Sequence, residues 1–296
     1  MFKITITQYL FILFFLLGSK VNSQNIADAN KKTEFKTENI KFKSAGIILA
    51  GTVLVPQHPI AAVVLVHGSG QEKRMIKLAA HLATQGIAVL TYDKRGVGES
   101  GGVYFGPEVG TNNIDSANLN LLALDASEAS NALLKHLASK RISIGLIGFS
   151  QAGWVIPLAA SKNPKINFMI LFSGPIITTL EQLRFQFYTK GNSKFWETHT
   201  EDEARAHIQN DPDKYQFVAT DPIHTLEKLK IPGLWIFGGK DIQVPVGLSI
   251  ERLNSLKEIG KNYEHQLFPA LGHNTITSNS TETLSLAIKW IKKQLK

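Results

Sequence analysis

The sequence predicts an α/β protein, in which a mostly parallel, doubly wound sheet is covered by helices on both faces. Short and continuously apolar runs recur along the chain, and such runs are typical of strands buried on both faces. Helical patterns separate these runs, and the alternation of strand and helix favours parallel pairing. The chain has 296 residues and is 44% hydrophobic, which is enough for one large domain with a sizeable core.

The first half of the predicted sheet begins with an N-terminal β-hairpin. Two strand-like runs, "ENIKFKS" and "GIILAGTVLVP", meet at "SAG", which is a turn signal. The next strands are "AAVVLVHGSG" and "GIAVLTYD", and a helical pattern over 73–85 separates them. A glycine-rich loop, "KRGVGESGG", leads to a long helical pattern over roughly 112–138, and "ISIGLIGF" is the strand that follows.

The second half continues the alternation with one interruption. A helix over 151–161 precedes the strand "INFMILFSGP", and the strands "IPGLWIFGG" and "YEHQLFPA" flank a helix over 246–259. A C-terminal helix is predicted over 281–295. The region 176–220 is rich in aromatic residues and holds no strand-like run. We expect a small helical cap insertion at about 176–222, over the carboxyl edge of the sheet, where open α/β sheets bind substrates.

Residues 1–23 are predicted to be a signal peptide that exports the protein to the periplasm or the extracellular space. Lys3 gives a basic start, and "YLFILFFLL" is apolar but shorter than the 20 or so residues that span a bilayer. Cleavage before Gln24 would leave a domain at 24–296 with no stable membrane span; an uncleaved anchor is the alternative. The sequence has no cysteine, which excludes disulfides and a lipid-modified cysteine.

The net charge of +8 does not indicate a nucleic-acid partner. The basic residues are scattered, and no basic stripe with interleaved aromatic residues is present, so a solvated basic surface is the better interpretation. The spacing of His199 and His207 suits no common metal site. The sequence therefore implies neither a metal nor a cofactor, and it does not indicate an oligomeric state.

A serine stands where a buried strand meets a helix, in "LIGFSQAGW". On such a tight turn the side chain projects from the carboxyl edge of the sheet. The turn needs small neighbours, which are Gly148 and Ala152, and Gly153 lets the helix pack closely. This arrangement predicts a nucleophile elbow with Ser150 as the nucleophile, although the usual G-x-S-x-G pattern has Ala152 at its last position here. The alternative is that Ser150 only caps the helix.

A serine nucleophile needs a base and an orienting acid, in the chain order Ser, acid, His for this architecture. Asp241 directly follows the strand "LWIFGGK", and His273 follows the last strand in "ALGHNT". Both positions belong to the carboxyl edge, so we expect Asp241 and His273 to complete a triad with Ser150. Asp221 precedes its strand and Glu251 lies within a helix, so neither is expected to be the acid.

An acyl-transfer site also needs hydrogen-bond donors for the oxyanion that develops on the substrate. We expect one donor to be the backbone N–H of Gln151, the residue after the nucleophile. The other is the N–H of Ser69, in the loop after "VVLVHGSG", with Gly70 as the alternative. His67 precedes the nucleophile in the chain, and we expect it to support this loop rather than to act as the base.

The stretches "HGSG", "YDKRGVGESGG", "GFSQAG", "GGKD" and "GH" occur in the order seen in the α/β-hydrolase superfamily, which the chain resembles over residues 40–296. It resembles most the exported bacterial esterases and the serine aminopeptidase (S33-type) branch, and it is similar to dienelactone hydrolases and prolyl-oligopeptidase-like domains. The stretch "YDKRGVGES" resembles the D-x-R-G-x-G-x-S loop of that group, which implies that Asp93 and Arg95 brace this loop. The resemblance implies the fold and the reaction type and leaves the substrate open.

Four functions fit these observations. The first is a hydrolase of carboxylic esters with small to medium acyl groups, a small-molecule substrate class. The second is a serine aminopeptidase, which must anchor a substrate ammonium and could use the acidic residues of the insertion, Glu197, Glu201, Asp202 and Glu203. An acyltransferase would differ only by excluding water. A binding protein on an inactive hydrolase fold is disfavoured, because all three expected triad residues are present. We expect the ester hydrolase, since esters have the better leaving group and need no charged anchor.

Overall fold

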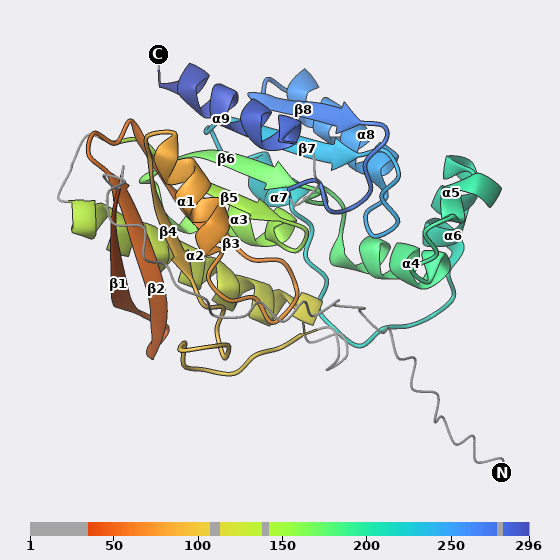
Figure 1. Cartoon of the computed structure of the whole chain (residues 1–296). Coiled ribbons are helices and arrows are strands. Elements are labelled where there is room, and N and C mark those ends of the chain that lie inside the picture. Colours follow the sequence, from red (N-terminus) through yellow and green to blue (C-terminus); the bar gives the residue numbers. More distant parts are fainter. Residues whose placement is uncertain (1–34, 107–112, 138–141, 277–280, 296) are drawn as a thin grey trace, which may run out of the picture. The chain divides into compact units, whose positions relative to one another are not determined.

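The computed structural model describes residues 35–106, 113–137, 142–276 and 281–295 (Figure 1). The expected signal peptide and both ends of the helix expected over 112–138 lie outside the described residues. The strands of the described residues are β1 (Phe35–Ser44), β2 (Ile47–Pro56), β3 (Ala61–Val66), β4 (Ile87–Tyr92), β5 (Ile144–Phe149), β6 (Ile166–Phe172), β7 (Gly233–Gly238) and β8 (Tyr263–Phe268). The helices are α1 (Ile76–Thr84), α2 (Ser116–Leu137), α3 (Ala152–Lys162), α4 (Thr179–Thr189), α5 (Phe195–Thr198), α6 (Glu201–Asn210), α7 (Ile223–Leu226), α8 (Val246–Glu258) and α9 (Glu282–Gln294).

The strands of the described residues form one sheet in the order β1-β2-β4-β3-β5-β6-β7-β8. β2 pairs antiparallel with both β1 and β4, and every other neighbouring pair is parallel. The predicted mostly parallel sheet with an N-terminal hairpin is therefore confirmed. At the hairpin turn Ala45 and Gly46 have φ values of 44° and 80°. A two-residue loop with both φ values positive matches the twist of the strands that it joins.

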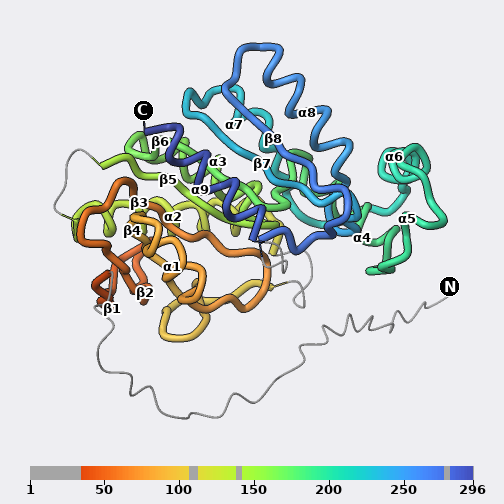
Figure 2. Tube along the Cα trace, turned by 45° about the horizontal axis from the view of Figure 1, so that its top comes forward, coloured from red at the N-terminus to blue at the C-terminus, as the bar shows by residue number. Residues whose placement is uncertain are grey.

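Helices cover both faces of the sheet (Figures 1 and 2). Side chains of α1 and α9 pack in one hydrophobic cluster, and side chains of α2, α3 and α8 pack in the other. Successive residues of β3 alternate between these clusters: Val63 belongs to the first and Val64 to the second. Because side chains alternate along a strand, a strand covered on both faces is apolar throughout, which explains the continuous runs in the sequence.

Residues 179–210, in the connection between β6 and β7, contain α4, α5 and α6, and we call them the helical segment. This segment lies beyond the carboxyl ends of the strands (Figures 1 and 2). α4 and α6 begin at capping boxes, in which Thr178 exchanges hydrogen bonds with Glu181 and Thr200 with Glu203. A small cluster centred on Phe185 forms a core for the segment itself. The four-residue helix α7, which follows the segment, was not predicted, because it is too short to show a helical period.

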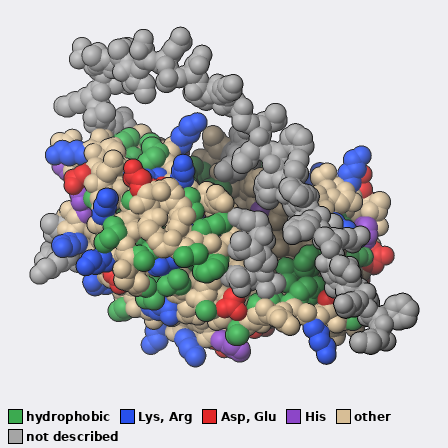
Figure 3. Space-filling view, turned by 90° about the horizontal axis from the view of Figure 1, so that it is seen from below, with side chains coloured by type: hydrophobic (Ala, Val, Ile, Leu, Met, Phe, Trp, Pro, Cys, Tyr) green, Lys and Arg blue, Asp and Glu red, His purple; other side chains and the backbone are tan. Residues whose placement is uncertain are grey.

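On the face drawn in Figure 3, the Lys and Arg side chains of the described residues are dispersed among neutral and apolar residues. Of the helices within the described ranges, none combines the length and the apolar character needed to cross a membrane.

Candidate active site

Three of the predicted site residues lie on loops at the carboxyl edge of the sheet. Ser150 directly follows β5, Asp241 follows β7, and His273 follows β8. β5, β6, β7 and β8 are consecutive neighbours in the sheet and are all parallel. Their carboxyl ends therefore meet at one edge, and loops separated by more than 120 residues of sequence come together there.

Ser150 occupies a strained turn between β5 and α3. Its φ is 53°, in the left-handed region that non-glycine residues rarely adopt. The Ser150 N–H donates to the carbonyl of Phe172 on β6 at 3.0 Å, and the Ser150 carbonyl accepts from Gly153 N–H at 2.8 Å. Hydrogen bonds on both sides of the residue hold the strained conformation, and its side chain is half-buried. Strain of this kind is concentrated at functional sites.

Close packing explains the small residues around Ser150. A Cβ atom at Gly148 would lie 2.5 Å from the Cβ of Ala152 and 2.9 Å from the carbonyl oxygen of Val66. The Ala152 methyl group thus fits because position 148 has no side chain, which accounts for the departure from G-x-S-x-G. A Cβ at Gly153 would lie 2.5 Å from the Cδ of Pro175, so glycine allows α3 to approach the loop after β6.

Asp241 and His273 are joined by a hydrogen bond of 2.8 Å between Oδ2 and Nδ1. The Asp241 side chain is fully buried, whereas the His273 side chain is 18% exposed. Asp241 Oδ1 accepts from the backbone N–H of Gln243 at 2.7 Å and of Val244 at 3.0 Å. These two bonds fix the carboxylate and direct its second oxygen to the imidazole, so this arrangement can orient a histidine for proton transfer.

Ser173 holds the loop that carries His273, although the sequence analysis did not single it out. Its hydroxyl donates to the carbonyl of His273 at 2.6 Å and lies 3.0 Å from the Thr275 hydroxyl. Ser173 also has a positive φ, of 50°, directly after β6. The only sequence signal was a serine at the end of a buried strand, in "LFSGP", and its partner is 100 residues away.

The loop after β3 lies beside the Ser150 turn, because Val66 pairs with Gly148 at the ends of β3 and β5. A Cβ at Gly68 would lie 2.8 Å from Cε2 of Phe149, so glycine lets this loop approach β5. Within the described ranges, neither the Ser69 N–H nor the Gln151 N–H donates to a loop carbonyl. Because Ser69 follows β3 and Gln151 follows Ser150, both predicted oxyanion donors lie at the same edge as Ser150.

Lys94 is a further residue that the sequence analysis missed. Only 2% of it is exposed, and its ammonium donates to the carbonyl of Gly68 at 2.6 Å and to Oε1 of Gln151 at 3.0 Å. It thus links the loop after β3 to the residue after the nucleophile. The lysine stands at the variable position of the D-x-R-G pattern, where the pattern itself carries no information.

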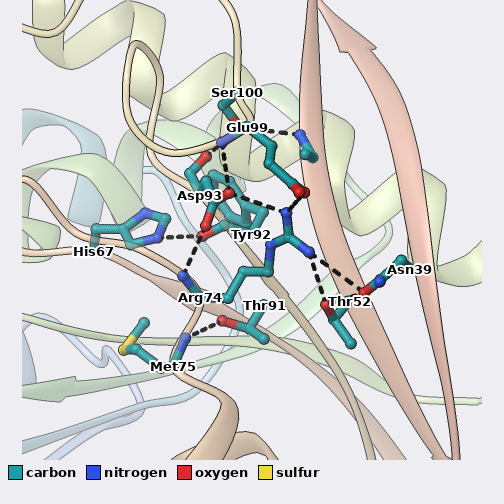
Figure 4. A network of polar contacts seen from close by, with 11 residues as sticks. Asn39, Thr52, His67, Arg74, Met75, Thr91, Tyr92, Asp93, Glu99 and Ser100 are labelled. Atoms are coloured by element: carbon teal, nitrogen blue, oxygen red, sulfur yellow. Dashed lines mark hydrogen bonds and ion pairs between the residues drawn. The ribbon is translucent and has the colours of Figure 1, made fainter.

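His67 supports the same loop, as expected. Its Nε2 lies 2.6 Å from the carbonyl of Tyr92, and its ring packs edge-on against the Tyr92 ring (Figure 4). Burial, together with the nearby charge of Lys94, lowers the pKa of His67 to about 3. His67 is therefore neutral near pH 7, and because a carbonyl only accepts, Nε2 carries the proton.

Asp93 and Arg95 brace the loop after β4, and Figure 4 shows the contacts of Asp93. Asp93 accepts hydrogen bonds from the backbone N–H and the guanidinium of Arg74, each at 3.0 Å, and from Glu99 N–H at 2.9 Å. Burial by itself would raise the pKa of Asp93, but these bonds outweigh burial and hold the pKa below its usual value. Arg95 forms a bidentate ion pair with Asp125 of α2, and both side chains are buried.

The histidines of the helical segment take part in aromatic packing. His199 stacks on Phe195 with ring centroids 4.2 Å apart, and His207 stacks on Tyr188 at 4.1 Å. The described ranges contain no group of three or more His, Asp or Glu side chains placed to hold a metal ion.

Comparison with known proteins identifies a family and a fold. The model of the family "Serine aminopeptidase, S33" matches residues 57–231, more than half of the chain. An esterase from Pyrococcus furiosus has a TM-score of 0.66 at 20% identity and covers 88% of this chain and 92% of its own. No curated protein matches the sequence significantly.

Two further solved structures are similar over 88% of this chain. An acylaminoacyl peptidase from Pyrococcus horikoshii has a TM-score of 0.61 at 17% identity, with 41% of that chain covered. A dienelactone hydrolase from Anabaena variabilis has a TM-score of 0.59 at 17% identity, with 98% covered. At these identities the likeness shows a shared fold, which is the predicted α/β-hydrolase fold.

Proposed function

The chain belongs to the S33 serine aminopeptidase family of α/β-hydrolases, and from this premise we propose that it hydrolyses carboxylic esters of small to medium acyl groups through Ser150, His273 and Asp241. The observation that carries the proposal is the 2.8 Å hydrogen bond between buried Asp241 and His273, at the sheet edge where Ser150 occupies its left-handed turn.

The proposed reaction has two steps with one acyl-enzyme intermediate. Ser150 Oγ attacks the ester carbonyl carbon while its proton passes to Nε2 of His273. The oxyanion accepts hydrogen bonds from the N–H groups of Ser69 and Gln151. Collapse of the tetrahedral intermediate releases the alcohol, which takes the proton from His273. A water molecule, deprotonated by His273, then attacks the acyl-enzyme, and its collapse returns the proton to Ser150 and frees the carboxylic acid.

Asp241 sets the direction of this proton transfer. An ionised carboxylate only accepts hydrogen bonds, so Nδ1 of His273 carries a proton and Nε2 keeps its lone pair for the serine hydroxyl. The two backbone N–H groups on Oδ1 fix the position of the carboxylate, so that Oδ2 faces Nδ1 of His273. Loss of the orienting acid in such a triad lowers kcat by about 10⁴-fold.

The four acidic residues considered above as an anchor for a substrate ammonium lack the environment for that role, which favours ester over aminopeptide hydrolysis. Glu203 completes the capping box of α6 and is exposed. Glu201 forms an ion pair with Arg205 at 3.1 Å. Glu197 and Asp202 are exposed. A substrate ammonium buried at the active site needs a desolvated acid as its partner, and none of these four residues has that environment.

Glu72 is a half-buried carboxylate beside the loop after β3, and its electrostatic surroundings also suit an ester better than an ammonium. Burial raises the pKa of Glu72 above its usual value, and the nearby Lys94 ammonium only partly offsets this. A carboxylate that is less readily ionised, with a cation already close to it, is a weak anchor for a second cation.

The packing of the helical segment supports the preference for small to medium acyl groups. Phe185 and Phe195 are fully buried in the core of the segment itself, and Trp196 stacks on Phe185. The Trp196 indole also donates to the carbonyl of Asp241 at 2.8 Å. Because these aromatic residues pack within the segment, they are not available to enclose a long acyl chain.

A substrate panel tests the proposal. We expect efficient hydrolysis of p-nitrophenyl acetate and butyrate, slow hydrolysis of the palmitate ester, and very slow cleavage of aminoacyl nitroanilides. Ser150→Ala is the matched control and should lower kcat by about 10⁶-fold. The ester assignment is wrong if an aminoacyl nitroanilide gives a higher kcat/KM than the short esters.

The triad assignment has its own test, which does not depend on the natural substrate. A fluorophosphonate probe should label the wild type once and should not label Ser150→Ala. His273→Ala should fold and should lose labelling and turnover together. Labelling of a serine other than Ser150, or high activity in His273→Ala, would require a different nucleophile or base.

We further propose that the protein is exported, on the strength of the apolar run at residues 9–17 and the small residues before Gln24. The mass of the intact protein from its native host should correspond to a chain that begins near Gln24. A mass that equals the full sequence would instead indicate a retained anchor.

A further inference from the structure

Lys94 has surroundings that its place in the sequence does not explain. It follows Asp93 in the loop after β4, and its residue is 2% exposed. Its ammonium donates to the carbonyls of Gly68, at 2.6 Å, and Gly70, at 3.4 Å, and to Oε1 of Gln151, at 3.0 Å. A buried ammonium is costly, so these carbonyl-type acceptors must compensate a large desolvation penalty.

Peptide geometry connects these bonds to the oxyanion site. In a trans peptide group the C=O and the N–H point in opposite directions. The Gly68 carbonyl and the Ser69 N–H belong to one peptide group, so the bond from Lys94 directs the Ser69 N–H away from the ammonium. A hydrogen bond to the carbonyl also polarises the peptide group and makes its N–H a stronger donor.

Neighbouring contacts fix the rest of the loop in the same way. The Tyr104 hydroxyl donates to the carbonyl of Ser69 at 3.0 Å, which orients the following Gly70 N–H. The Lys94 ammonium lies 5.6 Å from the centroid of the Tyr104 ring, a cation–π distance. On the other side, the Gln151 amide donates to the carbonyl of Asn113 at 2.8 Å. One ammonium therefore bridges the two segments that carry the expected donors.

We propose that Lys94 is a positioning residue of the oxyanion site. It holds the Ser69 peptide group and the start of α3 in the relative positions that stabilise the transition state. The proposal rests on the proposed function of Ser150. It predicts a loss in kcat, not in substrate binding, because the oxyanion forms only in the transition state. Removal of one complete oxyanion donor lowers kcat by about 10²–10³-fold, and loosening one donor should cost less.

The test compares Lys94→Met with Lys94→Arg and with Lys73→Met as a matched control, since Lys73 is an exposed lysine close to the same loop. kcat is expressed per active site, counted by fluorophosphonate labelling at completion, so that misfolded protein does not contribute. With p-nitrophenyl butyrate, Lys94→Met should lower kcat by about 10–100-fold and change KM by less than about 3-fold. Lys94→Arg should recover part of the loss, and Lys73→Met should match the wild type.

A transition-state mimic separates positioning from a merely structural role. A trifluoromethyl ketone forms a hemiketal oxyanion on Ser150, so its affinity should fall in Lys94→Met by about the same factor as kcat. A structural role alone would lower stability and the number of active sites, but not kcat per site. The proposal is overturned if Lys94→Met keeps kcat per site within 3-fold of the wild type, or if only KM rises.

Two further measurements test the proposal if Lys94→Met does not fold or if the wild type does not hydrolyse esters. Should Lys94→Met not fold, Tyr104→Phe removes the neighbouring bond to the Ser69 carbonyl and should lower kcat, but not KM, by about 3–10-fold; an unchanged kcat overturns the proposal. Should the wild type not hydrolyse esters, the rate of fluorophosphonate labelling should still be about 10-fold lower in Lys94→Met. Equal rates of fluorophosphonate labelling in the wild type and in Lys94→Met would overturn the role of Lys94. If the wild type does hydrolyse esters and the two labelling rates are equal, only the role of Lys94 is overturned and the proposed function stands.

Discussion

Glycine and alanine should rank in opposite orders at two serines of this protein, and the order at Ser150 measures the strain in its turn. Ser150 has a φ of 53°, whereas Ser255 is an exposed residue of α8. Both substitutions at a given position remove the same hydroxyl. The difference in unfolding free energy between the glycine and alanine variants therefore reports on the backbone conformation alone.

The magnitude follows from two opposing effects. A left-handed conformation costs a residue with a Cβ about 1–2 kcal/mol, and glycine does not incur this cost. Glycine loses more freedom on folding, which costs about 0.5–1 kcal/mol. Ser150→Gly should thus be more stable than Ser150→Ala by about 0.5–1 kcal/mol. At Ser255, in a helix, glycine should be less stable than alanine by about 1 kcal/mol.

Urea unfolding of the four variants, followed by tryptophan fluorescence, measures these differences, because buried Trp154 and Trp235 report on the core. Equal denaturant dependences would show that the variants unfold in the same way. If Ser150→Gly is less stable than Ser150→Ala by as much as Ser255→Gly is less stable than Ser255→Ala, the turn stores no strain. Neither variant at position 150 should hydrolyse esters, so the comparison is independent of turnover.

Three other predictions concern the supports of the site. Histidine in the unfolded chain binds a proton below about pH 6.5, whereas buried His67 stays neutral down to about pH 3. The unfolding free energy of the wild type should therefore fall by about 2 kcal/mol more than that of His67→Asn between pH 7 and pH 5. Arg95→Met should cost about 3–5 kcal/mol in urea unfolding, because it leaves Asp125 buried without its ion pair, and a loss below 1 kcal/mol would contradict this. Gly153→Ala should lower the unfolding free energy by about 1–3 kcal/mol, since its Cβ would lie 2.5 Å from Pro175 Cδ; a neutral effect would show that the loop moves easily.

Much of the fold could be predicted because the central strands of the sheet are buried on both faces. A strand such as β5 lies between helices of two clusters, so its apolar run is continuous and easily recognised. The positions of Ser150, Asp241 and His273 followed from the rule that parallel strands end at one edge. α7 escaped prediction because four residues show no periodicity, and a local hydrogen bond from Ile223 N–H to Asp221 helps to start it.

The supporting residues of the site could not be predicted for a different reason. Their roles depend on partners that are distant in sequence, and no local pattern encodes such pairs. Lys94 contacts Gln151 across 57 residues, and Ser173 contacts His273 across 100. Arg95 illustrates the contrast, because its place in a known pattern implied a bracing role, but only the structure identifies Asp125 as the partner.

If the protein acts as proposed, the contacts of the helical segment link substrate choice to catalysis. The indole of Trp196 donates to the carbonyl of Asp241, and the Thr189 hydroxyl donates to the carbonyl of Ile242, each at 2.8 Å. The loop that carries the proposed acid is therefore held partly by the segment that covers the carboxyl edge. A change in the packing of this segment that admits a larger acyl group would also move the main chain of Asp241, and through it the imidazole of His273. Substitutions that alter specificity should accordingly alter kcat as well as KM.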